Sequence, residues 1–381
     1  MLISFAQRTF GEKAVLQLKK LGYFSIFSAP IMFTTSLWLG NKFGVQNIAA
    51  WFTLFFIYCL VPFLDLIVGS EYIDPAKFSA DLNLKKSKFY SAILFLCIPL
   101  ELSMISLGAY ALFNYDLNLA GQFGVLCSVG FISGTLAVNV SHELVHRLDK
   151  RENWAGGLLL SIVCFSSFKI DHIMHHHVWS ATPEDHLAAR RGQTVYSYLA
   201  LSNIKRTISA WGIEAARLKA AGENVFSFKN EMIYWYSFSA MWCLLFGLIF
   251  GPYGALYFLA QSMIAIAMMD VITYIEHYGL LRRKGKTGRY DRMTVNHSWN
   301  SNFFLTNLFL FNLPRHSDHH VYPNRKYQLL SHYEGSPELK FGYSTMMIIA
   351  MCPPLFFWMM HDKVDHFNKI NGSYEQSLAL R

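Results

Sequence analysis

Long apolar runs dominate the first third of the chain and return between residues 231 and 276. Each run has almost no charge inside and is long enough, at about 20 residues, for a helix to cross roughly 30 Å of hydrocarbon. The pattern predicts six membrane-spanning helices, at about 21–41, 47–69, 89–111, 120–141, 231–250 and 254–276. A buried core helix of a soluble protein could explain one such run, but six favour an integral membrane protein.

The polar stretches around these runs predict how the rest of the chain is organised. Residues 1–20 are mildly amphipathic and basic, which is typical of a helix lying at the membrane surface. We expect the polar segments 142–230 and 277–381 to form a helical cap on one membrane face. There is no internal repeat and no low-complexity linker. The expected fold is therefore all-α, with residues 1–381 forming a single membrane domain.

The basic residues indicate the orientation in the membrane. Of the 33 Lys and Arg residues, only Lys42 falls in a connection opposite the two large polar segments. Because basic loops stay in the cytoplasm, both termini and the cap should lie on the cytoplasmic side of the inner membrane. The net charge of +8 follows from this skew. No basic stripe with interleaved aromatic residues suggests a nucleic-acid partner.

The cysteines exclude several kinds of site. They are scattered singly, and none belongs to a C-x-x-C pair. A disulfide framework, a zinc ribbon and an iron–sulfur or rubredoxin-type site are therefore poorly supported.

The histidines are distributed very unevenly. None of the 15 lies in residues 1–141, and all lie on the side predicted to be cytoplasmic. Scattered surface histidines would not avoid a third of the chain and then cluster, so we interpret the clusters as a site. Nine of them occur in four segments: His142 and His146 in HELVH, His172, His176 and His177 in DHIMHHH, His277 in IEHYG, and His316, His319 and His320 in RHSDHH.

The spacing of these histidines indicates metal binding. His142 and His146 are four residues apart, so both can face one metal from a helix. His172 and His176 repeat this relation, and neighbours such as His176 and His177 can diverge to serve two metals. Nine imidazoles are too many for one ion, whereas two ions could use four or five each. Imidazole suits zinc, copper, iron and nickel. Tetrahedral zinc or two irons that bind dioxygen are both compatible with this set.

Four motifs carry a family resemblance. HELVH, the H-x-x-x-H-H run of DHIMHHH, EHYGL, and LPRHSDHH followed by PNRKYQ resemble the histidine motifs of membrane-bound non-haem diiron alkane monooxygenases, also called alkane hydroxylases. These enzymes belong to the fatty-acid desaturase and hydroxylase superfamily. The resemblance extends from about the second predicted span to residue 360.

The resemblance implies a function and its requirements. The nine histidines named above would hold two iron ions in a six-helix membrane protein with a cytoplasmic cap. The reaction would be terminal hydroxylation of medium- to long-chain n-alkanes to primary alcohols with dioxygen. Electrons would come from a separate rubredoxin that is reduced by a rubredoxin reductase, and the basic face of the chain would suit an acidic donor.

The chain departs from the family pattern at three positions. The second motif usually reads Glu-His-x-x-Gly-His-His, but Asp171 replaces the Glu and His175 replaces the Gly. A Pro that usually follows a Glu-Asp pair is His186 here. We expect His175 to face the interior of the cap rather than to compete as a ligand, and we assign no metal role to His186.

Nearby carboxylates are candidates for orienting the imidazoles. Histidines that bind a metal usually donate their other N–H to a carboxylate, a carbonyl or water. Each candidate could instead form an ordinary salt bridge. The candidates are Glu143, Asp171, Asp185, Glu276 and Asp318.

The substrate would reach the metals through the membrane. An alkane partitions into the bilayer, so a narrow channel between apolar helices could deliver it end-first. The resemblance implies that a bulky side chain before Pro62 in the second span limits chain length. That position is Ile57, or Tyr58 beside it. A side chain as small as Ile57 favours medium to long chains, but Ile57 could also simply pack against lipid or a neighbouring helix.

Other functions explain less of the sequence. HELVH satisfies the H-E-x-x-H pattern of a zinc protease, but that reading leaves seven ordered histidines without a role. A metal transporter needs a polar path, and the spans contain few ionisable residues besides Asp65, Glu101 and Asp270. A fatty-acyl desaturase and a xylene or alkyl-aromatic methyl hydroxylase use the same histidine scaffold, and product analysis would separate them from an alkane hydroxylase.

Overall fold

The chain is helical throughout the part that the structure describes. The structure is a computed structural model, and it describes residues 1–380. Within that range there is no β-strand, only isolated bridges such as the one between Ser70 and Phe303. The predicted all-α fold class is confirmed.

Five helical stretches within residues 1–380 are long and apolar enough to cross a membrane. They are Gln46–Val68, Phe89–Asn114, Leu119–Val145, Glu231–Phe250 and Pro252–His277. They correspond to five of the six predicted spans. The predicted span 21–41 is not among them, since it is divided between the short η1 and the 15-residue α3. A further pair, α18 (Tyr343–Ala350) and α19 (Pro353–Ile370), is apolar enough but bent by 116°.

Short connections join most of the N-terminal and membrane helices, but residues 69–88 separate α6 from α7 and residues 146–230 separate α9 from α14. Gly11, with φ of 82°, separates the first two helices of the segment that we predicted to lie at the membrane surface. The elements are α1 (Leu2–Phe10), α2 (Glu12–Gly22), η1 (Tyr23–Phe27), α3 (Ser28–Lys42), α4 (Gln46–Ala49), α5 (Phe52–Phe55), η2 (Phe56–Leu60), α6 (Val61–Val68), α7 (Phe89–Asn114), α8 (Leu119–Ser133), η4 (Gly134–Asn139), α9 (Val140–Val145), α14 (Glu231–Phe250) and α15 (Pro252–His277).

The remaining helices lie in the segments predicted to form the cap. Side-chain caps define several starts: Asp149 accepts from the backbone of Arg151 and Glu152, and Thr194 accepts from that of Ser197. The elements are η3 (Pro75–Phe78), α10 (Lys150–Ile162), α11 (Ser167–Asp171), η5 (His172–His176), α12 (His177–Trp179), α13 (Val195–Ala220), α16 (Phe304–Phe309), α17 (His316–Val321), η6 (Tyr327–Leu329), α18, α19 and α20 (Tyr374–Leu378).

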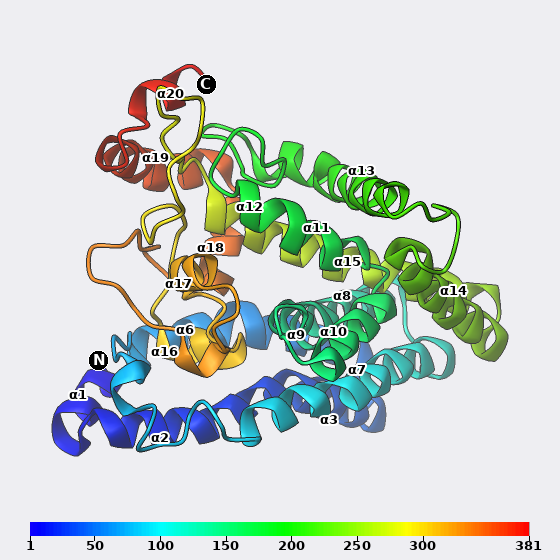
Figure 1. Cartoon of the computed structure of the whole chain (residues 1–381). Helices are drawn as coiled ribbons and strands as arrows, with labels where there is room; N and C mark the ends of the chain where they lie inside the picture. Colours follow the sequence, from blue (N-terminus) through cyan, green and yellow to red (C-terminus); the bar gives the residue numbers. More distant parts are fainter. Residues whose placement is uncertain (381) are drawn as a thin grey trace.

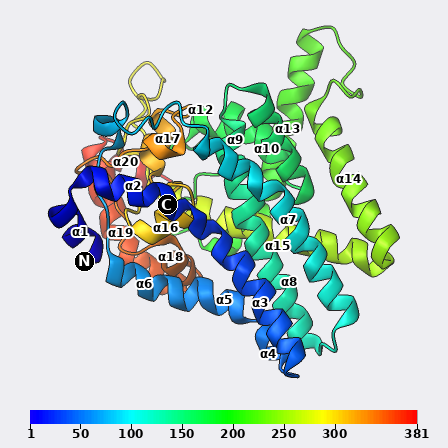
Figure 2. The same cartoon turned by 90° about the horizontal axis from the view of Figure 1, so that it is seen from below.

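The helices surround a centre to which distant parts of the chain contribute. Figure 1 shows α2, α3 and α7 along one side of the molecule and α13 with α19 along the opposite side. Between them lie α8, α9, α15 and α17. Figure 2 shows α4 at one end of the molecule and α12 with α17 near the other end. The helix that begins beside α4 as α8 continues through η4 and α9, so it spans the distance between these ends.

Three segments within residues 1–380 are π-helical, namely η2, η4 and η5. A π turn inserts one residue into a helix and is frequent at functional sites. The segment η2 contains Ile57 and Tyr58, η4 directly precedes the helix with His142, and η5 contains His172 and His176. All three π segments therefore carry or adjoin residues that the sequence marks as candidates for the site.

Small residues let α8 and α15 approach closely. A Cβ atom added to Gly130 would lie 2.5 Å from the Cβ of Ile264, and one added to Gly134 would lie 2.4 Å from the Sδ of Met268. Helices in a membrane associate largely through such close packing, because lipid provides no hydrophobic driving force between them. This contact fixes the helix that leads to His142 against the helix that ends at His277.

We predict that Gly130→Val separates α8 from α15 and destabilises the protein by about 1–3 kcal/mol, as overpacking usually does. Thermal unfolding in detergent measures this change. The matched control is Gly212→Ala in the exposed part of α13, where an added Cβ meets nothing within 4 Å. That substitution should leave stability unchanged or raise it slightly. Equal melting temperatures for the Gly130 variant and the unmodified protein would show that the contact is not tight.

Candidate metal centre

Four segments of the chain bring the nine predicted histidines together. The helix α9 carries His142 and ends just before His146, and α15 ends at His277. The remaining six come from two short stretches of the segments predicted to form the cap. These are His172, His176 and His177 on η5 and α12, and His316, His319 and His320 on α17.

The first group consists of His142, His146, His172 and His319. One nitrogen of each lies within 4.8 Å of the others. His177 adjoins this group, because its Nε2 lies 3.1 Å from the Nε2 of His172 and 3.2 Å from that of His319. Five imidazoles therefore surround one small volume.

The second group consists of His176, His277, His316 and His320, and it too satisfies the 4.8 Å limit. The Nε2 of His277 lies 3.1 Å from that of His176 and 2.9 Å from that of His316. The Nε2 of His320 lies 3.0 Å from the Nε2 of His316. The two groups adjoin one another, since the rings of His177 and His320 stack with centroids 4.4 Å apart.

Neighbouring histidines are divided between the two groups. His176 and His177 face different groups, as do His319 and His320. The interpretation that His172 and His176 share one metal is wrong for this arrangement. The π turn of η5 adds a residue, so the ring of His172 meets His177 at i+5 rather than His176 at i+4.

Burial favours the neutral form of five histidines outside the apolar spans. Burial, together with the neighbouring imidazoles, lowers the pKa of His172, His177, His316 and His320 well below its usual value. The same causes lower the pKa of His319 to about 3. A neutral imidazole has a free lone pair at pH 7, which is the form that a metal binds.

Two of the predicted carboxylates contact these histidines. Asp185 Oδ2 lies 2.9 Å from Nδ1 of His176, and Glu276 Oε1 lies 3.4 Å from Nδ1 of His316. Burial alone would raise the pKa of Asp185, but His176, His277 and the N–H of Leu187 outweigh it and hold this pKa below its usual value. Asp185 therefore stays ionised and can orient His176 through Nδ1, leaving Nε2 directed at the second group.

Two further contacts at the second group were not predicted. The hydroxyl of Tyr343 donates to Glu276 at 2.8 Å, and Ser180 Oγ lies 3.3 Å from Nδ1 of His277. Neither residue belongs to a histidine motif, although Ser180 lies only three residues after His177. Contacts of this kind depend on the folded arrangement and leave no spacing pattern in the sequence.

The other three predicted carboxylates have different partners. Glu143 forms an ion pair with Arg147 and accepts from the N–H of Tyr327 at 3.0 Å. Because Glu143 is held in this way, it is not placed as the base of a zinc protease. Asp318 accepts from Arg325, Tyr333 and the N–H of Ser331. It fixes the loop after α17 instead of orienting an imidazole.

Asp171 lies in a third group of possible ligands, with His175 and His186, whose ligand atoms also lie within 4.8 Å of one another. Asp171 is fully buried, and His175 and His186 are partly buried. His175 stacks on His186 with 4.5 Å between ring centroids, and its predicted orientation toward the interior of the cap stays a prediction. Among residues 1–380, Asp171 makes no hydrogen bond to any of the nine histidines in the two groups.

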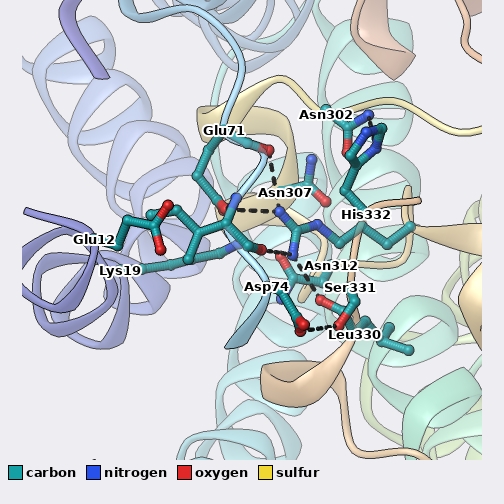
Figure 3. Close-up of polar contacts among 12 residues, drawn as sticks. Glu12, Lys19, Glu71, Asp74, Asn302, Asn307, Asn312, Leu330, Ser331 and His332 are labelled. Atoms are coloured by element: carbon teal, nitrogen blue, oxygen red, sulfur yellow. Dashed lines mark hydrogen bonds and ion pairs between the residues drawn. The ribbon is translucent and has the colours of Figure 1, made fainter. Parts of the chain in front are cut away.

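A buried ionic cluster holds Arg315, the residue that precedes His316, and Figure 3 labels its partners Lys19, Glu71 and Leu330. Arg315 donates to Glu71 Oε1 at 2.8 Å and to the carbonyl of Leu330 at 2.6 Å, and Lys19 donates to Glu71 Oε2 at 2.6 Å. Burial alone would raise the pKa of Glu71, but Arg315 and Lys19 outweigh it and lower this pKa to about 2. The cluster links α2 and the loop after α6 to the start of α17. Our sequence reasoning did not single out these residues.

An apolar cavity of about 60 Å³ lies between the π-helical segment η2, which carries Ile57 and Tyr58, and α15. Its lining includes Ile57, Tyr58, Met268, Ile272 and Leu310. Leu310 also lines a very small cavity beside His142 and His319. Both residues predicted for the channel therefore face the same apolar space, and that space approaches the first histidine group.

Comparison with known proteins places the chain in a family. The model of the fatty acid desaturase family matches residues 119–349. Alkane 1-monooxygenase 2 of Pseudomonas aeruginosa is 41% identical over 351 residues, which cover 92% of this chain and 93% of the relative. Alkane 1-monooxygenase 2 of Alcanivorax borkumensis is 39% identical over 354 residues, which cover 93% of each. The chain is an alkane 1-monooxygenase family member.

A relative with a different substrate in its name is less similar. The xylene/toluene monooxygenase hydroxylase component of Pseudomonas putida is 26% identical over 294 residues, 75% of this chain and 76% of the relative. Membership of the alkane 1-monooxygenase family makes the chain an oxidoreductase. Its apolar helices indicate a membrane protein. The histidine groups fit the metal centre that such an enzyme needs, because they offer eight buried imidazoles and the partly buried His177, and no thiolate.

We predict that Asp185→Ala lowers the affinity of the second histidine group for its metal by roughly 10–100-fold, as loss of such a supporting contact usually does. Metal retained after dialysis against a chelator measures the effect. The control is Glu184→Ala at the adjacent, exposed position, whose side chain contacts Tyr290 and Lys284 rather than a group histidine. If both variants retain the same metal content, Asp185 does not support the centre.

Proposed function

We propose that this protein hydroxylates the terminal carbon of medium- to long-chain n-alkanes to give primary alcohols. Family membership supports this function, and the observation that carries it is the pair of adjoining imidazole groups next to an apolar cavity. An alkane offers no polar handle for acid–base groups, so its reaction needs a metal centre and a site that positions the chain end.

The proposed cofactor is a pair of non-haem irons. His142, His146, His172, His177 and His319 would hold one, and His176, His277, His316 and His320 would hold the other. When bound, the irons would activate dioxygen so that one oxygen atom enters the terminal C–H bond and the other leaves as water. The protein contributes neutral, oriented imidazoles and a buried setting.

The apolar cavity supports a route for the alkane. Ile57 and Tyr58 lie on the π segment η2 and face the inner helix α15 across it. Thr135 of η4 also lines the cavity, one and a half turns before the helix that bears His142. A chain that entered from the bilayer would pass these residues before its end reached Leu310 and the first histidine group. Met and Leu side chains along the way can shift to widen this narrow space.

The buried surroundings would also exclude water. Tyr343 lines the cavity and donates to Glu276, whose other contact is His316. This chain of contacts would fix the position of His316 while keeping the polar groups paired beside an apolar substrate. An enclosed site of this kind protects the reaction from side reactions with solvent.

The reaction needs electrons from outside the chain. The six cysteines occur singly in the sequence, so a separate rubredoxin with its reductase is the proposed donor. The basic residues are concentrated in the polar segments around the histidines, which suits docking of an acidic protein. The same distribution supports a location in the inner membrane, with the cap and both termini in the cytoplasm.

We predict that the purified protein, supplied with rubredoxin, its reductase, dioxygen and an n-alkane, yields a primary alcohol, and that it holds two irons per chain. His316→Ala should abolish turnover and lower the iron content. The control, His366→Ala, removes an exposed histidine outside the groups and should change neither. Gas chromatography and metal analysis measure both.

Other products would identify the remaining alternatives. A new double bond in an acyl chain would indicate a desaturase, and faster oxidation of the xylene methyl group than of any alkane would indicate an alkyl-aromatic hydroxylase. One zinc per chain with no iron, or full turnover by His316→Ala, would contradict the diiron proposal.

We predict that Ile57→Trp shortens the preferred alkane, because the larger ring fills the cavity through which the chain passes. A competition assay with alkanes of different lengths measures the preference. The control is Ile67→Trp on α6, an exposed position that does not line the cavity. An unchanged product profile for Ile57→Trp would mean that Ile57 only packs against its neighbours.

A further inference from the structure

Three possible ligands outside the nine-histidine site converge at a separate place. Asp171 is the last residue of α11, His175 lies on η5, and His186 belongs to the loop before α13. His186 Nε2 lies 3.4 Å from Asp171 Oδ2. The rings of His175 and His186 stack with centroids 4.5 Å apart and an angle of 29°. One ligand atom of each residue lies within 4.8 Å of the other two.

We propose that Asp171, His175 and His186 form a third metal site, which takes a divalent ion of the zinc class. Two imidazoles and a carboxylate are a donor set that holds such an ion with a fourth position open to water. The site is distinct from the two groups of the candidate metal centre, and the proposal does not depend on the reaction that this centre performs.

Asp171 gives the strongest support for an ion. Its side chain is fully buried, its partners are Ser209 and the ring of His186 at 3.4 Å, and neither carboxylate oxygen has a short hydrogen bond among residues 1–380. The Nε2 atom of His186 is buried, and its contact with Asp171 is equally long. A buried carboxylate without hydrogen bonds is costly unless it is paired or binds a metal. A divalent ion between Asp171 and His186 would satisfy both residues at once.

The ring of His175 is already oriented for binding. Its Nε2 lies 3.2 Å from the carbonyl oxygen of Glu184. Because a carbonyl can only accept, Nε2 carries the proton and the lone pair of the neutral ring is on Nδ1. Histidines that bind metals commonly donate their other N–H to a carbonyl in this way.

An ion can reach this place from the surface. His186 lines a cavity of about 570 Å³ whose lining also includes the exposed Glu184 and Arg190. The cavity therefore connects one ligand with the outside of the cap.

A bound ion would also support the main centre from outside. It would fasten the loop that carries Asp185 and His186 to η5. Asp185 is the residue that contacts Nδ1 of His176 in the second histidine group.

The test uses the iron-loaded protein in detergent, titrated with Zn²⁺ against a coloured chelator. We expect the unmodified protein to take up one Zn²⁺ per chain without releasing iron. The double variant His175→Ala/His186→Ala should retain its iron and bind this Zn²⁺ at least about tenfold more weakly. His366→Ala, which removes an exposed histidine elsewhere, should bind Zn²⁺ like the unmodified protein.

If the double variant loses iron, a second measurement still tests the third metal site. His175→Ala alone should then be compared with the unmodified protein by Co²⁺ titration, because the visible absorption of Co²⁺ changes when a nitrogen ligand is lost. A changed spectrum supports the site. The proposal is overturned if Zn²⁺ binds only by displacing iron, if no Zn²⁺ binds, or if the variants bind Zn²⁺ and Co²⁺ as the unmodified protein does.

Discussion

Nine imidazoles that face one another set the main constraint on this fold. A neutral ring has one N–H and one lone pair on different nitrogens. The Nε2 atom of His277 lies about 3 Å from those of both His176 and His316, and the Nε2 atom of His316 also faces His320. One nitrogen cannot donate to one neighbour while accepting from another, so hydrogen bonds alone cannot satisfy these rings. Lone pairs directed at a shared cation can, and the surrounding helices hold the rings in place for it.

The sequence predicted much of the fold, because hydrophobic runs have a length that matches the membrane and histidines stand out in an apolar chain. Five spans and the all-α class were predicted correctly. All nine chosen histidines lie together in the structure, including His277, which is separated from the other segments in the sequence. The span at 21–41 was not found as predicted, because α3 is short and η1 divides it from α2. Whether the nine histidines bind iron stays a prediction.

The grouping of the histidines and the partners of the carboxylates could not be predicted, because neither leaves a periodic pattern in the sequence. A regular helix places His172 beside His176, but the π turn in η5 brings His172 to His177 instead. Among the carboxylates, Asp185 and Glu276 could not be told from Glu143 and Asp318 by their distance from a histidine in the sequence. Their roles depend on which partner the fold supplies: an imidazole for the first two, an arginine for the others.

The ionic cluster of Lys19, Glu71 and Arg315 has a consequence for biosynthesis. Arg315 and Glu71 are separated by 244 residues, and Lys19 lies still nearer the start of the chain. The segments that carry Lys19 and Glu71 are synthesised long before Arg315, and these two residues can pair with each other first. The last histidine segment reaches its place only when Arg315 arrives at Glu71. Loading of the second histidine group therefore belongs to the final stage of folding, after translation has passed residue 320.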